Sequence, residues 1–222
     1  MNSNRGVSGK FITLEGGEGC GKSTQAKLLA AYLQEHNIKT VLTKEPGGTP
    51  EGLLLRQMLV TGDKDKFDAI AECLLYYADR RVHLQKLVWP ALAQNQWVIS
   101  DRFADSTEAY QYYGYEKRVD FATLQSLYKM VAGDFKPDLT IILDMPPEVG
   151  MRRSLAKAEQ MAVKELRFES RQIEFHNNLR RGFLEIAKRE PERCVVLNAD
   201  ISVEELHRQI VHVIEEKFGI NG

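Results

Sequence analysis

The chain has 222 residues, of which 43% are hydrophobic and 27% charged, a composition typical of a globular protein with a sizeable core in one domain. Thirty Lys and Arg residues against 31 Asp and Glu residues leave a net charge of −1. This balance excludes a broad basic field and so argues against a generic nucleic-acid or membrane-surface binder. A local basic pocket remains compatible with it.

The cysteine pattern indicates a reducing compartment. Cys20, Cys73 and Cys194 are odd in number and far apart, and no pair has zinc-site or Cys-x-x-Cys spacing. The sequence has no uninterrupted apolar run of 18 residues, and its first residues lack an apolar signal-peptide segment. We therefore expect a cytoplasmic protein, with residues 1–9 as a loose polar tail and residues 10–222 as a single domain.

Strand-like and helix-like patterns alternate along the chain. Short apolar runs bounded by turn residues predict five strands, at 11–14, 38–43, 97–100, 139–143 and 194–197. Helical patterns lie between them, at 22–36, 50–61, 67–93, 105–132 and 147–189, the last two interrupted. A final helix begins near Ser202, with Glu205 at the spacing of a capping box. The short apolar runs fit strands buried on both faces, so the sequence predicts a three-layer α/β/α sandwich with a five-stranded parallel sheet.

One charged stretch, residues 156–167, interrupts the periodicity of the long helical region 147–189. It fits a solvated helix face as well as it fits a mobile lid. The residues alone leave both interpretations open.

The strongest local motif follows the first predicted strand and opens the first helix. Residues 16–23 fit the phosphate-binding pattern GxxxxGK[ST]. Glycines let successive backbone N–H groups point into one concavity, and the helix start adds unpaired amides and a positive dipole end. Lys22 would reach the β- and γ-phosphates of ATP, and Ser23 would offer its hydroxyl to Mg²⁺. The predicted ATP-binding residues are Gly16, Gly17, Glu18, Gly19, Cys20, Gly21, Lys22, Ser23 and Thr24. ATPases, GTPases and kinases all share this motif, so it predicts nucleotide binding and leaves the reaction open.

Asp101 and Arg102, at the end of the third predicted strand, point to a second phosphate. Ligands of open α/β sheets bind at the carboxyl ends of the strands, where Asp101 could hold Mg²⁺ and Arg102 could clamp an acceptor phosphate. A local salt bridge is the plain alternative, and the helix arginines Arg56 and Arg80 carry the same ambiguity. A phosphate acceptor, with a second pKa of about 6, needs arginine, lysine and Mg²⁺ more than it needs a strong base.

Together these segments resemble the thymidylate kinase family, colinearly from about residue 10 to residue 200. The matching segments are 14–24, 45–49 (EPGGT), Tyr76 with 78–80, 100–111 (including DRFxDSTxAYQ) and 137–150. EPGGT and DRFxDSTxAYQ are far more specific than the phosphate-binding loop. The resemblance implies a P-loop NTPase-type kinase domain with a helical lid at about 154–167. It also implies a homodimer that transfers the γ-phosphate of ATP, with Mg²⁺, to dTMP.

The resemblance also assigns residues to the acceptor. Tyr76 stands where the family has an aromatic ring stacked on thymine, and Arg80 matches an arginine that bonds the base carbonyl. Tyr110 matches a tyrosine that crowds the ribose 2′ position, and Glu18 matches an acid near the sugar 3′-hydroxyl. The implied dTMP site comprises Glu18, Glu45, Pro46, Arg56, Tyr76, Arg80, Arg102, Ser106, Thr107, Tyr110 and Gln111.

An acidic phosphate-binding loop of this kind goes with an arginine supplied by the lid, and Arg167 best matches that position. Arg153, Lys157 and Lys164 remain alternatives for the γ-phosphate contact, although a lysine cannot form the bidentate fork of arginine. The implied catalytic residues are Lys22, Arg102 and Arg167.

Two other functions stay open. Another nucleoside or nucleotide kinase, acting on dUMP, a deoxynucleoside or a guanine nucleotide, would share the fold and differ in its base pocket. A P-loop switch or regulatory ATPase would bind nucleotide without transfer, but it leaves EPGGT and DRFxDSTxAYQ unexplained. We expect neither a nucleic acid nor a membrane as a partner.

Overall fold

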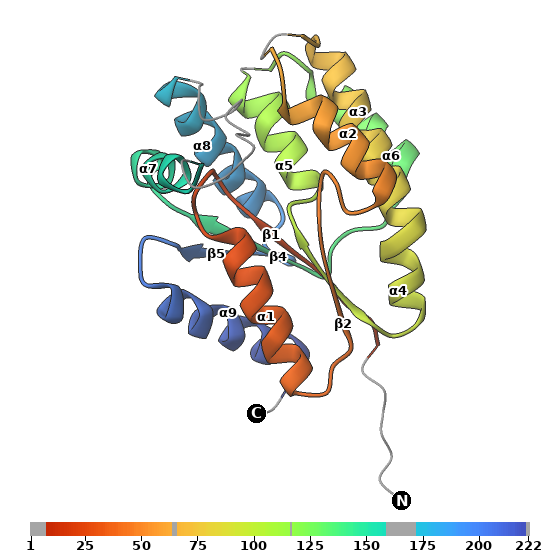
Figure 1. The fold of residues 1–222 in the computed structure, drawn as a ribbon, viewed down its shortest axis with the longest axis vertical. Helices are drawn as coiled ribbons and strands as arrows, with labels where there is room; N and C mark the ends of the chain where they lie inside the picture. Colours follow the sequence, from red (N-terminus) through yellow and green to blue (C-terminus); the bar gives the residue numbers. More distant parts are fainter. Residues whose placement is uncertain (1–7, 64–65, 116, 159–171, 221–222) are drawn as a thin grey trace, which may run out of the picture.

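A central parallel sheet organises the computed structural model, which describes residues 8–63, 66–115, 117–158 and 172–220 (Figure 1). Its strands are β1 (Phe11–Glu15), β2 (Thr40–Lys44), β3 (Trp97–Asp101), β4 (Leu139–Asp144) and β5 (Cys194–Asn198). They lie in the order β2-β3-β1-β4-β5, and every neighbouring pair is parallel. The predicted α/β fold with a five-stranded parallel sheet is confirmed.

Helices connect each strand to the next. From β1 to β3 the connections are α1 (Lys22–Glu35), α2 (Pro50–Val60), α3 (Ala69–His83), the π-helical turn η1 (Leu84–Val88) and α4 (Trp89–Ala93). From β3 onward they are α5 (Ala104–Glu108), the π-helical turn η2 (Ala109–Gly114), α6 (Phe121–Ala132), α7 (Pro147–Ala158), α8 (Ile173–Arg189) and α9 (Val203–Phe218). The alternation of strands and helices is as predicted.

Helix and strand ends follow local signals, with one boundary corrected. The hydroxyl of Ser202 accepts a hydrogen bond from the backbone N–H of Glu205 at 3.1 Å, as the capping-box spacing predicted. The predicted start of β2 at residue 38 is wrong, because the N–H of Ile38 donates to the carbonyl of Leu33 and closes the end of α1. Strand pairing begins only at Thr40.

The two faces of the sheet differ in chemistry. Successive side chains of a strand point to opposite faces. On one face, Ile12 and Leu14 of β1 pack beneath α1 and α9, which lie side by side (Figure 1). On the other face, Phe11 packs with η1 and α4, but the next inward residues of β1 are the fully buried Thr13 and Glu15. The second face therefore becomes polar toward the carboxyl ends of the strands, where ligands of open α/β sheets bind.

No helix in the described part of the chain combines the length and the apolar character needed to cross a bilayer. The segments predicted as the tail (1–9) and the lid (154–167) lie largely outside the described residues.

Candidate active site

The phosphate-binding loop, residues 16–23, joins the end of β1 to the start of α1. Gly19 and Gly21 have φ angles of 68° and 95°, in the left-handed region that favours glycine. A Cβ at Gly19 would lie 1.9 Å from the carbonyl oxygen of Gly150, so no larger residue fits there. The glycines give the loop its tight shape, and the loop leads directly into the N-terminus of α1. A glycine-rich loop at a helix N-terminus is an arrangement that binds phosphate.

Lys22 lies inside this loop. Its side chain is 7% exposed, and Nζ donates to the carbonyl oxygens of Gly16 at 3.1 Å and Gly17 at 2.6 Å. The ammonium group is thereby held at the concave side of the loop. Phosphate oxygens would offer it charged acceptors, which make stronger hydrogen bonds than neutral carbonyls.

Ser23 and Asp101 meet next to the loop. The Ser23 hydroxyl donates to the Oδ2 atom of Asp101, which ends β3. Both residues line a groove together with Lys22 and Arg153. A hydroxyl and a carboxylate are oxygen ligands of the kind that Mg²⁺ prefers, so this pair fits the metal predicted for it.

Arg102 connects the phosphate-binding loop to a second cavity. Its backbone has a φ of 72°, and its guanidinium donates to the carbonyl oxygen of Gly16 at 3.0 Å and to Ser106 Oγ at 3.0 Å. A third bond joins Nη2 to Glu18 Oε1 at 2.9 Å. The Tyr110 hydroxyl donates to the same Glu18 oxygen, and its ring lies 5.2 Å from the guanidinium. The guanidinium is therefore fixed from several sides.

Glu18 stays ionised in this setting. Burial by itself would raise the pKa of Glu18, but the positive charges of Arg102 and Lys22 and the hydrogen bond from Tyr110 outweigh burial and lower that pKa to about 2. The negative charge of Glu18 in the phosphate-binding loop is thus compensated by neighbouring cations. In return, its ion pair with Arg102 neutralises part of the positive charge of that guanidinium.

The second cavity opens between the β2–α2 turn, α3 and the segment after β3. Its lining comprises Glu18, Glu45, Pro46, Arg56, Val60, Tyr76, Asp79, Arg80, Arg102, Phe103, Ser106, Thr107 and Tyr110. Every predicted acceptor residue except Gln111 is in this set. Glu18, Glu45, Arg56 and Arg102 also line the groove of Lys22 and Ser23. The groove and the cavity therefore meet at two arginines.

Arg80 forms the inner wall of the cavity and is 1% exposed. Its Nε donates to Glu45 Oε2 at 3.0 Å, and Nη2 donates to Thr107 Oγ1 at 2.9 Å. The guanidinium lies 4.8 Å from the Tyr77 ring and 4.9 Å from the Phe103 ring. Nη1 is buried and has no hydrogen-bond partner among the described residues. A buried, unused donor at a cavity wall suits a carbonyl acceptor on a ligand.

Asp79 is a cavity residue to which the sequence assigned no role. Its Oδ1 accepts a hydrogen bond from the Gly47 N–H at 3.0 Å, and Oδ2 has no partner among the described residues. Burial, followed by the negative charge of Glu45, raises the pKa of Asp79 to about 7. Its place beside Arg80 in the matching segment 78–80 is the signal that could have found it.

His83 supports the cavity from behind and was also missed. Its Nδ1 lies 2.7 Å from Glu45 Oε1, and its Nε2 lies 2.8 Å from Thr43 Oγ1. Glu45 is therefore held by His83 on one oxygen and by Arg80 on the other. His83 follows Arg80 by three residues on α3, so the helical period was the available clue.

Gln111 lies away from the cavity lining. It is fully buried, and its Nε2 donates to Glu72 Oε1 at 3.0 Å. A contact between Gln111 and dTMP stays a prediction, and the side chain instead links η2 to α3.

The lid residues divide into described and undescribed positions. Arg167, Lys164 and the side chain of Lys157 lie outside the described residues. Arg153 is described: it lines the groove and donates to Asp200 Oδ1 at 3.1 Å.

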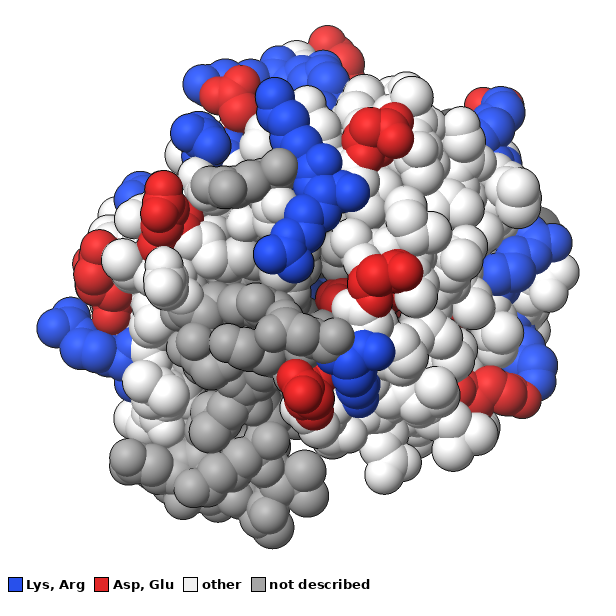
Figure 2. Space-filling view, turned by 90° about the horizontal axis from the view of Figure 1, so that it is seen from above, with Lys and Arg blue, Asp and Glu red and all other residues white. Residues whose placement is uncertain are grey.

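Basic charge gathers locally although the whole chain is nearly neutral. Figure 2 shows Lys and Arg side chains in a band across the face seen from above, with acidic side chains on either side. This end of the molecule carries α2, α5 and α8 (Figure 1).

Fold and site together define a P-loop nucleotide-binding protein in which an anion-binding groove adjoins a second cavity, lined by aromatic, charged and hydroxyl side chains. This is the layout of an enzyme that transfers a phosphoryl group between two bound molecules.

Comparisons with known proteins specify the family. The sequence pattern of the thymidylate kinase family matches residues 14–210. A thymidylate kinase of Bradyrhizobium sp. (strain ORS 278) is 44% identical over 209 residues, covering 94% of this chain and 91% of the relative. One of Magnetococcus marinus is 42% identical over 215 residues, covering 97% of this chain and 100% of the relative. The crystal structure of thymidylate kinase from Ehrlichia chaffeensis superposes with a TM-score of 0.73 at 35% identity, covering 93% of this chain and 99% of that one.

The chain belongs to the thymidylate kinase family. It is an ATP-dependent phosphotransferase that phosphorylates dTMP to dTDP.

Proposed function

We propose that dTMP occupies the cavity beside α3, with its phosphate at Arg56 and Arg102, and that the phosphates of ATP lie in the loop 16–23. The observation that carries this proposal is the overlap of the two sites, because both linings include Arg56 and Arg102. Cations at the junction would screen the repulsion between two anionic substrates and align them for transfer.

The base end of dTMP would lie at Tyr76 and Arg80. Tyr76 lines the cavity and offers an aromatic face for stacking, and the unused Nη1 of Arg80 would donate to a carbonyl of the base. Glu18 and Tyr110, joined by a hydrogen bond, would lie against the sugar. The donor of Arg80 would favour a base with a carbonyl at that position over one with an amino group.

The reaction would proceed mainly by positioning. A phosphate acceptor already carries a nucleophilic oxygen, so the chain needs no strong base at this point. Lys22 would hold the transferring phosphate and Arg102 the acceptor, and both are fixed by neighbouring carbonyl oxygens. A lid arginine, with Arg167 first and Arg153 as the described alternative, would complete the contact with the γ-phosphate.

Ser23 and Asp101 would hold Mg²⁺ together with the nucleotide. Bound there, the ion would neutralise charge on the β- and γ-phosphates. Within the described residues no group of three or more His, Cys, Asp or Glu side chains forms a ready-made metal site. The nucleotide and water would therefore supply the remaining ligands, which is how Mg²⁺ is usually held beside phosphates.

A homodimer is proposed through α2 and α3, which lie next to each other (Figure 1). Leu53 and Leu54 of α2 are 53% and 65% exposed, and Leu74 of α3 is 51% exposed. Large apolar side chains exposed side by side mark interaction surfaces in soluble domains. Sedimentation of the wild type and of Leu54→Glu tests this proposal, with a monomer expected only for the variant. A monomeric wild type would contradict it.

The cytoplasmic location stays a prediction from the cysteine pattern. Cys20, Cys73 and Cys194 are all free and buried, which agrees with a reducing compartment.

A coupled ADP-release assay tests the proposed sites. The panel is dTMP, dUMP, thymidine, UMP, CMP, AMP and GMP, each with ATP and Mg²⁺. We expect strong turnover with dTMP, weaker turnover with dUMP and background with thymidine, which lacks the phosphate that Arg56 and Arg102 would bind. Preference for another monophosphate would overturn the assignment of Tyr76 and Arg80, and equal turnover of thymidine and dTMP would overturn that of the two arginines.

A further inference from the structure

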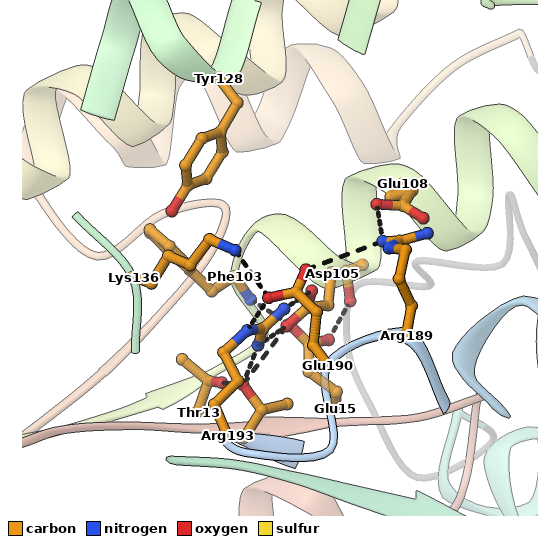
Figure 3. Close-up of polar contacts among 12 residues, drawn as sticks. Thr13, Glu15, Phe103, Asp105, Glu108, Tyr128, Lys136, Arg189, Glu190 and Arg193 are labelled. Atoms are coloured by element: carbon orange, nitrogen blue, oxygen red, sulfur yellow. Dashed lines mark hydrogen bonds and ion pairs between the residues drawn. The ribbon is translucent and has the colours of Figure 1, made fainter. Parts of the chain in front are cut away.

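Glu15 is a buried acid for which the proposed reaction has no use. It ends β1 directly before the phosphate-binding loop and is fully buried on the polar face of the sheet. Figure 3 shows it among side chains from β1, from α5 and from the turn before β5. Burying an ionisable side chain costs free energy unless its hydrogen bonds are satisfied, so the partners of Glu15 indicate what it does.

Both oxygens of Glu15 bind the segment that carries Arg102. Oε1 accepts the backbone N–H of Phe103 at 2.7 Å, and Oε2 accepts the hydroxyl of Ser106 at 2.5 Å. The same Ser106 oxygen accepts a hydrogen bond from Arg102 Nη1 at 3.0 Å. One carboxylate thus holds the residue that follows Arg102 and the side chain that orients its guanidinium.

The backbone of Arg102 needs such support. Its φ of 72° lies in the left-handed region, which costs a residue with a side chain free energy and persists where neighbours hold it. The N–H of Arg102 donates to the Leu14 carbonyl at 2.9 Å, and Glu15 fixes the next N–H along the chain. The two bonds from β1 bracket the strained residue.

An ion pair holds the far side of the same segment. Arg193 donates to both oxygens of Asp105 at 2.7 Å and to Thr140 Oγ1 at 2.7 Å (Figure 3). Asp105 is thereby paired, whereas among the described residues Glu15 forms no ion pair of its own. Burial, followed by the charge of Asp105, raises the pKa of Glu15 to about 7. The position of Glu15 therefore depends on its two hydrogen bonds, to the N–H of Phe103 and the hydroxyl of Ser106.

We propose that Glu15 is a positioning residue for the acceptor phosphate, acting through Arg102: its two hydrogen bonds hold the 102–106 segment so that the guanidinium faces the cavity. This inference rests on the proposed role of Arg102. It assigns Glu15 no contact with either substrate.

The test compares Glu15→Gln with the wild type for two ligands that differ only in the phosphate. A glutamine side chain keeps an acceptor oxygen for the Phe103 N–H but presents an amide donor to Ser106 Oγ, which already accepts from Arg102. The Ser106 hydroxyl then no longer donates to residue 15, and its bond to Arg102 is weakened. We expect the Kd of dTMP to rise about tenfold and that of thymidine to change less than about twofold. The KM of ATP should stay near the wild-type value. Equal weakening of dTMP and thymidine would overturn the proposal, because it would indicate a generally damaged cavity.

A double-mutant cycle separates action through Arg102 from an independent effect. In an Arg102→Ala background, Glu15→Gln should no longer weaken dTMP binding; a further tenfold loss would overturn the proposal. Thr13→Val is the matched control, since Thr13 lies on the same strand and face, is fully buried and bonds Thr140, which contacts the segment at Asp105 and not at the bonds around Arg102. It should leave both affinities unchanged.

Two outcomes keep this inference separate from the proposed function. Wild-type protein without dTMP turnover would contradict the proposed sites themselves. Active wild type with an unchanged dTMP affinity in Glu15→Gln would contradict only the role of Glu15. Should Glu15→Gln not fold, Glu15→Asp serves, because it keeps the charge and sets the acceptor atoms one carbon–carbon bond further back. The same selective loss of dTMP affinity is then expected.

Discussion

The phosphate-binding loop and the acceptor cavity are neighbours that are built in different ways. The loop takes its polar groups from the consecutive residues 16–23, and Lys22 finds its partners at Gly16 and Gly17. The cavity takes its groups from the β2–α2 turn, α3 and the segment after β3, and it keeps buried polar atoms without described partners on Asp79 and Arg80. Local backbone geometry suffices to bind phosphate, whereas selecting one acceptor needs side chains from distant segments and atoms left free for the ligand.

The same contrast holds for charge. Burial opposes ionisation at Glu18, at the edge of the loop, and at Asp79 in the cavity, yet the pKa of Glu18 is lowered to about 2 and that of Asp79 is raised to about 7. The positive charges of Arg102 and Lys22 act on Glu18, whereas after burial the largest influence on Asp79 is the negative charge of Glu45. Both carboxyl groups are buried, so the sign of the neighbouring charges decides whether the pKa falls, as at Glu18, or rises, as at Asp79.

The largest expected effect is on the loop. Lys22→Ala should lower kcat by about a thousandfold, because it removes the cation proposed to hold the transferring phosphate, and should leave dTMP binding almost intact. Steady-state kinetics and dTMP binding measured by calorimetry check both halves. Lys27→Ala, on the exposed side of the same helix, is the control and should behave as wild type. Near-normal turnover in Lys22→Ala would contradict the assignment of the transferring phosphate to the loop.

The next effect belongs to the cavity. Arg80→Ala should raise the KM of dTMP about a hundredfold and change the KM of ATP little, because a buried charged donor to the base is lost. The neighbouring Arg81→Ala is the matched control, since Arg81 bonds the Val131 carbonyl at 2.8 Å and does not line the cavity. Equal changes in both KM values would show that Arg80 is structural.

A smaller effect is expected where the two regions meet. Tyr110→Phe removes the hydroxyl that bonds Glu18 and keeps the ring beside Arg102, so the KM of dTMP should rise by about threefold to tenfold. The ring would still crowd the ribose, and preference for dTMP over its ribose analogue should persist. Tyr113→Phe is the control. Loss of the sugar preference in Tyr110→Phe would transfer that role from the ring to the hydroxyl.

The last expected effect concerns stability and pH instead of kinetics. Because the pKa of Asp79 is raised from 3.8 to about 7 on folding, the folded chain holds a proton that the unfolded chain has lost. Its contribution therefore falls as pH rises from about 4 to about 7, by at most about 1.4 kcal/mol per pH unit. Urea unfolding at pH 5, 6 and 7 should show Asp79→Asn gaining stability relative to the wild type across this range. Asp134→Asn, at an exposed acid with a lowered pKa, should show no such trend. If the difference in unfolding free energy between Asp79→Asn and the wild type stayed constant with pH, the Asp79 carboxyl would be ionised throughout this range.

Much of the fold followed from local patterns. Five short apolar runs between helical stretches predicted the parallel sheet, because a fully apolar strand fits a sheet that helices cover on both faces. Ser202 with Glu205 located the start of the last helix. The boundary at residue 38 was wrong because the N–H of Ile38 caps the end of α1 by bonding the Leu33 carbonyl, a contact that the apolar pattern does not encode.

The sequence by itself determined the phosphate-binding loop, since its contacts are local and carried by a motif of adjacent residues. The resemblance named ten of the residues that line the cavity, but only the tertiary structure decided how their side chains contact one another. It brought Asp79 and His83 to Glu45, turned Gln111 toward Glu72 and placed Glu15 behind Arg102. These contacts join residues far apart in the chain, and their partners depend on how strands and helices pack. The spacing of side chains along one element does not specify contacts between elements. The reaction could therefore be predicted from residue types, whereas the contacts within the acceptor cavity could not.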